Sequence, residues 1–208
     1  VAMTIAGRII PSFTAAAIPG LVAVVTPRRE RIVFVASLLA FGASALGLPG
    51  AAVALAAFAA AVAHLWRMSG WNSLATRHSP ILWILHLSYA WVPAGFALLG
   101  LAGLGLVSPI ASYHAFGIGV VAGLIIGMMT RTARGHTGRP LRVGAAETMA
   151  YVMVHLAALI RLAPLLGLNR RYGECLLLSG LLFAAAFLIY LVVYLPFLLR
   201  PRLDGKPG

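Results

Sequence analysis

Long apolar stretches separated by short polar segments run along almost the whole chain. A helix needs about 20 apolar residues to cross a bilayer, and six stretches are long enough: 31–48, 50–68, 80–104, 112–131, 143–163 and 175–199. A shorter apolar stretch at 1–10 is predicted to be the end of a seventh span. Because a backbone in lipid must satisfy its hydrogen bonds internally, each stretch is predicted to be a helix. The pattern therefore predicts an all-α transmembrane helix bundle, with 1–208 as a single domain.

One predicted span has a ridge of small residues. Within 112–131 they recur every four residues, at Ala115, Gly119, Gly123 and Gly127. Small side chains let a neighbouring helix approach closely, and packing of this kind holds helices together in lipid. We expect this ridge to be a helix–helix contact.

Composition supports the membrane class. Of the 208 residues, 62% are hydrophobic and 10% charged, with a mean hydropathy of +0.98. Soluble domains are about half apolar and about a quarter charged, so this chain has too little polar surface for a water-soluble globule. The single cysteine, Cys175, excludes an intrachain disulfide and a metal site built on paired cysteines.

The net charge of +12 comes from arginines in the connections between spans. In a soluble protein this charge would indicate nucleic-acid binding, but in a membrane protein basic connections mark the cytoplasmic side. We therefore expect a lipid bilayer as partner, no nucleic acid and a cytoplasmic C-terminus. One connection opposes this orientation, because Arg161, Arg170 and Arg171 fall on the outer side.

Histidines within or at the ends of the spans are the first candidates for chemistry, since polar groups are costly in a bilayer. They are His64, His86, His114 and His155. By the helical rise, His64 and His86 both fall about 6–9 Å from the cytoplasmic boundary and form the best-matched pair. His86 and His114 are more than about 10 Å apart along the membrane normal, too far to share one metal ion.

Two polar stripes each leave alternatives open. Trp83, His86 and Tyr89 recur every three residues and form either an aromatic wall for a flat cofactor or an ordinary bundle core. Glu147, Tyr151 and His155 recur every four residues. They could relay protons. The interpretation that we favour is that Glu147 pairs with a loop arginine while the other two satisfy each other.

The segment "MMTRTARGHTGRP" (128–140) begins as the tail of the span 112–131 and is then expected to become a cationic loop. Arg131, Arg134 and Arg139 surround His136, and the glycines at 135 and 138 permit positive φ and close approach. Arginines offer forked donors suited to carboxylates or phosphates. A loop that is basic only because it is cytoplasmic does not need glycines on both sides of His136. We therefore favour an anion-binding site here over a loop whose charge only sets the membrane orientation.

The chain resembles the NnrS family of bacterial membrane proteins. The resemblance rests on "GRIIPSFT" (7–14), "LWILHLSYAW" (82–91), "YHAFGIGVVAGLIIGMMTRTARGHTGRPL" (113–141) and "LRPRLDGKPG" (199–208). It covers almost the whole chain, and family members are roughly twice this length, so the chain matches their C-terminal half. The resemblance implies a haem- and copper-containing protein of the inner membrane, associated with nitric oxide metabolism and resistance to nitrosative stress. The matching residues are Arg8, Pro11, Thr14, His86, Tyr89, Trp91, His114, Arg131, His136, Thr137, Gly138 and Arg139.

Our hypothesis for the site is a haem with His86 as an axial ligand, since imidazole binds both haem iron and copper. Trp83 and Tyr89 would line the haem. Its propionates would pair with Arg131, Arg134 or Arg139. His136 would be a second haem ligand or a copper ligand, and His114 is the third metal candidate.

Two other functions stay open. The alternative is a small-molecule or anion transporter without a metal, since Pro93 interrupts a span. The other is a structural subunit that only binds a partner protein. The sequence has no phosphate loop, dinucleotide-binding turn, GxSxG elbow or HExxH motif, so nothing favours a kinase, dehydrogenase or hydrolase, and no enzymatic reaction is assigned.

Overall fold

The computed structural model describes residues 1–205, in which the regular elements are helices and no strand occurs. The all-α class is therefore confirmed. The last three residues of the C-terminal motif lie outside the described residues. The longer helices are α1 (Ala2–Ala17), α2 (Pro27–Ala45), α3 (Gly50–Ser69), α4 (Pro80–Gly103), α6 (Gly123–His136), α7 (Ala145–Leu162) and α8 (Tyr172–Leu198). The shorter ones are α5 (Pro109–His114), the π-helical η2 (Ala115–Ala122), and the 3₁₀ turns η1 (Ser73–Thr76) and η3 (Ala163–Leu166).

Five helical stretches of the described chain are long and apolar enough to cross a membrane: Gly50–Ser69, Pro80–Gly103, Pro109–His136, Ala145–Leu166 and Tyr172–Leu198. The remaining predicted span, 31–48, corresponds to α2. This helix is apolar over most of its length but has four charged residues in its first turns: Arg28, Arg29, Glu30 and Arg31. The helix predicted to end at residue 10 continues to Ala17. These helices indicate a multi-pass membrane protein.

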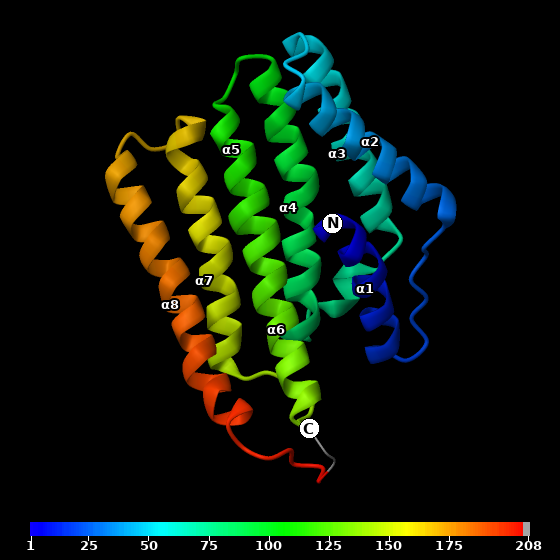
Figure 1. The fold of residues 1–208 in the computed structure, drawn as a ribbon, viewed down its shortest axis with the longest axis vertical. Helices are drawn as coiled ribbons and strands as arrows, with labels where there is room; N and C mark the ends of the chain where they lie inside the picture. Colours follow the sequence, from blue (N-terminus) through cyan, green and yellow to red (C-terminus); the bar gives the residue numbers. More distant parts are fainter. Residues whose placement is uncertain (206–208) are drawn as a thin grey trace.

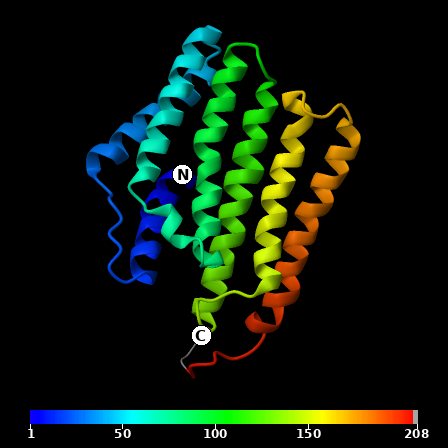
Figure 2. The same cartoon turned by 180° about the vertical axis from the view of Figure 1, so that it is seen from behind.

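The helices form an antiparallel bundle in chain order (Figures 1 and 2). The helix α4 lies in the middle, with α3 and α2 on one side and the continuous α5–η2–α6, α7 and α8 on the other. The short α1 packs against α4. Large apolar side chains on α8, such as Leu177 and Val192, are exposed, as expected for contact with lipid.

The predicted small-residue ridge is a contact surface. A Cβ added at Gly119 would overlap the Trp91 indole, and one at Gly127 would lie 2.8 Å from Cδ2 of Leu85. Both partners belong to α4, and Ala115 in the same ridge is fully buried. The ridge therefore brings α4 against the long central helix, and the prediction is confirmed.

The structure corrects the loop predicted to follow the span 112–131. The helix α6 continues through His136, so Arg131, Arg134 and Gly135 are helical. Nothing in this stretch breaks a helix until Gly138, which has a φ of +70°, and Pro140. The C-terminal tail folds onto this turn, since the Leu203 N–H donates to the Thr137 carbonyl at 3.1 Å. Two of the motifs that carry the family resemblance therefore touch.

Candidate functional site

Five polar side chains from three helices, α2, α3 and α4, meet inside the first half of the bundle, and we call them the polar centre: Glu30, Ser37, His64, Arg67 and Tyr89. Glu30 lies in the first turn of α2, where Thr26 caps the helix by accepting the Arg29 N–H at 3.3 Å. Arg67 lies in the last turn of α3. The antiparallel packing of α2 on α3 brings these two ends together.

Arg67 is only 2% exposed, and each of its three guanidinium nitrogens donates a hydrogen bond. Its Nε donates to Oε1 of Glu30 at 2.7 Å, and its Nη2 forms an ion pair with the same carboxylate. Its Nη1 donates to the Met3 carbonyl at 3.0 Å and to the Tyr89 hydroxyl at 2.8 Å. A buried guanidinium needs this many partners because an uncompensated charge is very costly in the interior.

The remaining hydrogen bonds of the polar centre run in one direction. Ser37 donates to the Val33 carbonyl at 2.7 Å, so its oxygen accepts from Nε2 of His64 at 2.9 Å. With its proton on Nε2, His64 accepts the Tyr89 O–H at Nδ1, over 2.6 Å. The Tyr89 oxygen in turn accepts from Arg67. One hydrogen-bonded chain thus links Arg67 to Ser37. The His64 tautomer with its proton on Nε2 is assigned from the donors and acceptors around the ring.

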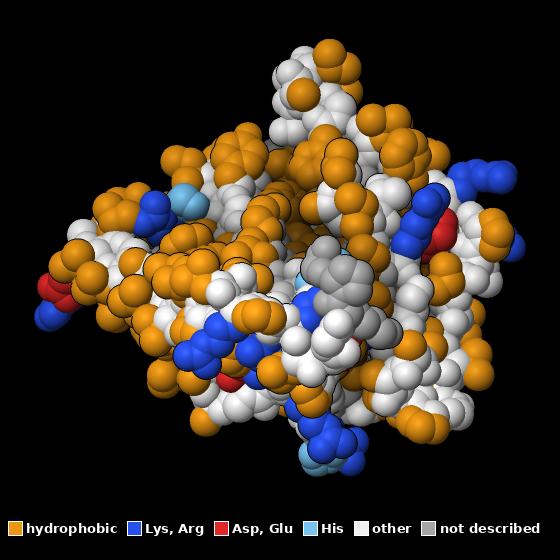
Figure 3. Space-filling model, turned by 60° about the horizontal axis from the view of Figure 1, so that its bottom comes forward, with side chains coloured by type: hydrophobic (Ala, Val, Ile, Leu, Met, Phe, Trp, Pro, Cys, Tyr) orange, Lys and Arg blue, Asp and Glu red, His pale blue; other side chains and the backbone are white. Residues whose placement is uncertain are grey.

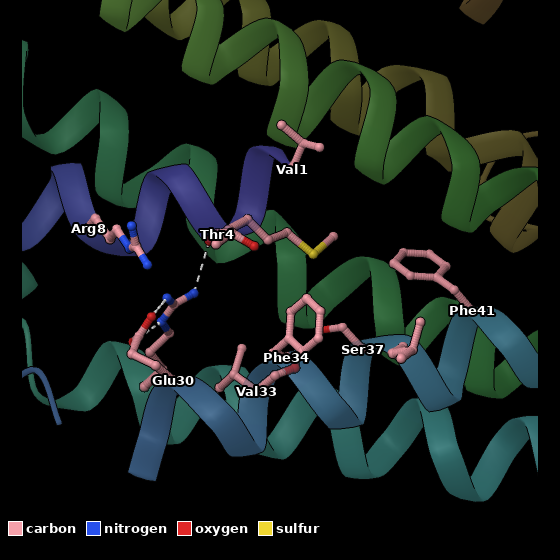
Figure 4. A pocket seen from close by; sticks show the side chains of 11 residues that line it. Val1, Thr4, Arg8, Glu30, Val33, Phe34, Ser37 and Phe41 are labelled. Atoms are coloured by element: carbon pink, nitrogen blue, oxygen red, sulfur yellow. Dashed lines mark hydrogen bonds and ion pairs between the residues drawn. The ribbon is translucent and has the colours of Figure 1, made fainter. Parts of the chain in front are cut away.

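A cavity of about 430 Å³ borders both ends of this chain (Figure 4). It lies between α1 and α2, with Arg8 pointing from α1 towards Glu30 on α2. One part of its wall is polar and the other apolar, and the lining residues are Val1, Met3, Thr4, Arg8, Glu30, Val33, Phe34, Ser37, Leu38, Phe41 and Arg67. The cavity can therefore hold a small molecule with a polar end and an apolar body.

His86, the proposed haem ligand, lies beside the polar centre in a second hydrogen-bonded set. Thr14 donates to the Ile10 carbonyl at 2.8 Å, so its oxygen accepts from Nε2 of His86 at 2.8 Å. Nδ1 of His86 then accepts from Ser73 at 2.9 Å. The ring is 4% exposed, and both of its nitrogens are engaged by hydroxyls.

The predicted aromatic wall is divided between two faces of α4. Tyr89 and His86 both contact the Trp71 ring, at centroid distances of 4.6 and 6.1 Å. Trp83 instead packs edge-on against Tyr151 of α7, at 5.9 Å. His64 and His86, the pair matched by depth, have separate hydroxyl partners and share no hydrogen bond among the described residues.

The three arginines of the 128–140 segment point to different partners. Arg131 stacks on Phe13 at 3.9 Å, and Arg139 stacks on Phe197 at 4.0 Å. Arg134 donates to Glu147 at 2.5 Å and to the Tyr194 hydroxyl at 2.9 Å. Phe13 adjoins Thr14, the partner of His86, so Arg131 lies at the same end of the bundle as His86.

The other two metal candidates lie far apart. His114 and His136 are at opposite ends of the longest helix, roughly 30 Å apart by its rise. Nε2 of His114 accepts from Nε of Arg161 at 3.2 Å, whereas His136 is exposed. Among residues 1–205, no three His, Cys, Asp or Glu side chains are grouped as metal ligands.

The interpretation that we favoured for the Glu147 stripe is half correct. Glu147 does pair with Arg134. Tyr151 and His155, however, do not satisfy each other, because His155 accepts at Nδ1 from the Trp91 indole N–H at 3.1 Å, while its Nε2 and the Tyr151 hydroxyl are buried without a partner in the described chain.

The sequence analysis missed the polar centre. Arg67, Glu30 and Ser37 were not among the predicted site residues, whereas His64 and Tyr89 were candidates. The available signal was that Glu30 is one of only four acidic residues in the chain, and an acid near apolar spans needs a cation.

Figure 3 shows arginine side chains at several separate places on this face of the molecule, with apolar side chains between them. A family model described as "NnrS protein" matches residues 1–202. Neither the comparison with curated proteins nor that with solved structures gave a match.

Proposed function

The chain belongs to the NnrS family, and we propose that it serves nitric oxide metabolism and resistance to nitrosative stress by binding a small molecule at the polar centre. The membership suggests a membrane protein associated with nitric oxide. We propose that the membrane is the bacterial inner membrane and that the C-terminus is cytoplasmic, in accordance with the basic connections.

The observation that carries this proposal is the hydrogen-bonded chain from Arg67 to Ser37, with both ends bordering one cavity. Polar groups are expensive inside a bundle of apolar helices, and they are commonly kept there for function. Arg67 and Arg8 offer donors to a ligand in the cavity, and Glu30 offers an acceptor. A ligand that altered the hydrogen bonds of Arg67 or Ser37 would therefore also affect Tyr89 and His64, which lie between them in the hydrogen-bonded chain.

Haem and copper are proposals that come from the family. The arrangement of His86 does not fit an axial ligand, because both ring nitrogens are already hydrogen-bonded to Thr14 and Ser73. His64 is engaged in the same way. We therefore assign neither metal to a residue. Iron and copper analysis of the purified protein, with its visible spectrum, tests both proposals. A Soret band that His86→Ala leaves unaltered would exclude His86 as a haem ligand.

A transporter without a metal is the second candidate. It is favoured by the charged cavity between α1 and α2, because transporters bind substrates between helices that are broken within the membrane. The irregular segment 21–26 separates these two helices. Folded protein that contains neither iron nor copper after stringent washing, and that moves a labelled anion in proteoliposomes, would favour this function.

The experiment that tests the main proposal uses a bacterium lacking its own copy of the gene, complemented with variants and exposed to a nitric oxide donor. Tyr89→Phe and Ser37→Ala should reduce growth under nitric oxide and leave growth without it unchanged. The matched control is Tyr113→Phe, since Tyr113 is 59% exposed. Full protection by both polar-centre variants, at equal protein abundance in the membrane, would refute the proposal.

A further inference from the structure

An apolar groove of about 540 Å³ lies along α2 and α3 and shares no lining residue with the polar centre. It is lined by seven apolar side chains, of which Ile32 belongs to α2 and the others to α3. Leu55 and Val62 in its wall are 75% and 65% exposed, and the small Ala59 lies between them in the sequence. These two helices form one edge of the bundle (Figure 1), so the groove is positioned to face lipid.

The groove extends along about half of a membrane span. From Leu55 to Trp66 the helical rise of α3 amounts to about 16 Å. The hydrocarbon core of a bilayer is about 30 Å thick, so this length corresponds to one leaflet. Trp66 lies near the end of α3, and tryptophan side chains are enriched where hydrocarbon meets the lipid headgroups. The length of the groove therefore matches one acyl chain in the leaflet on the Trp66 side.

Two arginines lie at the Trp66 end of the groove. The Arg29 guanidinium lies over the Trp66 ring, 4.8 Å from its centroid. Ile32 follows Arg28 and Arg29 by four and three residues, so all three share one side of α2. A Cβ added at Gly70 would overlap Nη1 of Arg29. The Arg29 guanidinium is therefore held in a defined position between α2 and α3.

Neither of these arginines has an acidic partner within residues 1–205. Glu30, their neighbour in the sequence, is paired with Arg67. Nη1 of Arg29 is buried and has no hydrogen-bond partner in the described chain. A cation beside lipid is costly without a counter-charge, and arginine offers forked donors that fit a phosphate. The apolar groove thus ends at a position suited to a phosphate group.

We propose that this groove binds an anionic phospholipid, with one acyl chain along α3 and the phosphate at Arg28 and Arg29. The apolar length and the cationic end match the two parts of such a molecule. Basic sites beside a span attract anionic lipids, whereas a zwitterionic lipid also carries a cation that these arginines repel. The site shares no residue with the polar centre, so it does not rest on the proposed function.

Native mass spectrometry of the full-length protein measures the binding of added phosphatidylglycerol and of phosphatidylcholine with the same acyl chains. The wild type should bind phosphatidylglycerol more tightly. Arg29→Gln should weaken this binding at least about fivefold, since one arginine near an anionic lipid surface contributes roughly that factor. The matched control Arg77→Gln removes the same charge from an exposed position between α3 and α4 and should retain wild-type binding. Equal binding of the two lipids, or equal effects of the two substitutions, overturns the proposal.

A second variant tests the apolar part of the site. Ala59→Phe should fill the groove and weaken phosphatidylglycerol binding without altering a charge. Its control, Ala184→Phe, adds the same ring at an exposed position of α8 and should have no effect. Unaltered binding in Ala59→Phe overturns the proposal. So does a cryo-electron microscopy map of the full-length protein in phosphatidylglycerol nanodiscs in which a protein segment fills the groove. If either variant fails to fold, this map and the lipid preference of the wild type decide.

Discussion

The hydroxyl of Tyr89 lies 2.6 Å from Nδ1 of His64 and 2.8 Å from Nη1 of Arg67. This one oxygen joins a buried cation to a buried imidazole, and its donor and acceptor capacities are both used. Removing it would leave a guanidinium N–H and a ring nitrogen without partners. Tyr89 is fully buried, so water cannot readily replace it.

We therefore predict that Tyr89→Phe lowers the free energy of unfolding by about 1–3 kcal/mol, the cost of leaving buried polar groups unsatisfied. Thermal unfolding of the purified protein in detergent measures this change. Tyr113→Phe removes the same atom from an exposed side chain and should change the free energy of unfolding by less than about 0.5 kcal/mol. Equal effects of the two substitutions would contradict the buried network.

The ion pair between Arg67 and Glu30 should contribute far more than an exposed pair. The side chains are 3% and 27% exposed. Arg67→Met should cost about 3 kcal/mol, the low end of the range for breaking a buried pair, because Glu30 retains some water. Chemical denaturation in mild detergent measures the loss.

The control for that pair is Arg171→Met. Arg171 pairs with Glu174 on the surface, where the side chains are 73% and 70% exposed. Removal of an exposed pair costs at most about 1 kcal/mol. Arg67→Met behaving like Arg171→Met would mean that Arg67 is solvated in the folded protein.

Two glycines of one motif should respond oppositely to alanine. Gly138 has a φ of +70°, and a Cβ there would lie 2.8 Å from Cγ of Asp204. Gly138→Ala should destabilise the protein by about 1–2 kcal/mol, the cost of the left-handed conformation. Gly135 is helical with open space around it, so Gly135→Ala should stabilise by about 0.5–1 kcal/mol. Differential scanning fluorimetry of both variants checks the sign; equal shifts would refute the assigned turn.

A second glycine pair tests the packing of α4 on the ridge. Gly119→Ala would force the Trp91 indole to move and should cost about 1–3 kcal/mol through overpacking. Gly117 faces open space two residues earlier, so Gly117→Ala should be neutral or stabilising. Tryptophan fluorescence during unfolding reports both. An unaltered melting temperature for Gly119→Ala would place Trp91 away from the ridge.

Features that repeat along the chain were predictable. The apolar stretches gave the helical class, and the four-residue spacing of Gly119 and Gly123 gave a contact surface that the structure confirms. The pairing of Glu147 with an arginine of the 128–140 segment was also predicted without naming which one, because an acid at the polar end of a span has few other partners; the structure gives Arg134.

Contacts between distant segments were not predictable. Thr14 and His86 belong to different spans, and no spacing in the sequence indicates that α1 packs against α4 at this height. The cationic segment was expected to be a loop because its polarity changes abruptly, but arginines are good helix formers and α6 continues to His136. A change from apolar to polar residues indicates where a helix leaves the apolar region, but it does not indicate where the helix ends.

The π-helical turns of η2 set the rotational register of the longest helix. In an α-helix, steps of four residues drift by about 40° each, whereas wider π turns drift less or in the opposite sense. A ridge with a strict four-residue period can therefore stay on one side across η2. Deleting one residue between 115 and 122 would let α-helical turns replace the wider π turns and keep the far part of the helix near its present rotation, whereas deleting one residue from the α-helical turns at 123–130 would rotate everything beyond by about 100°. The family signature at 131–139 would then face a different neighbour, although none of its own residues had been altered.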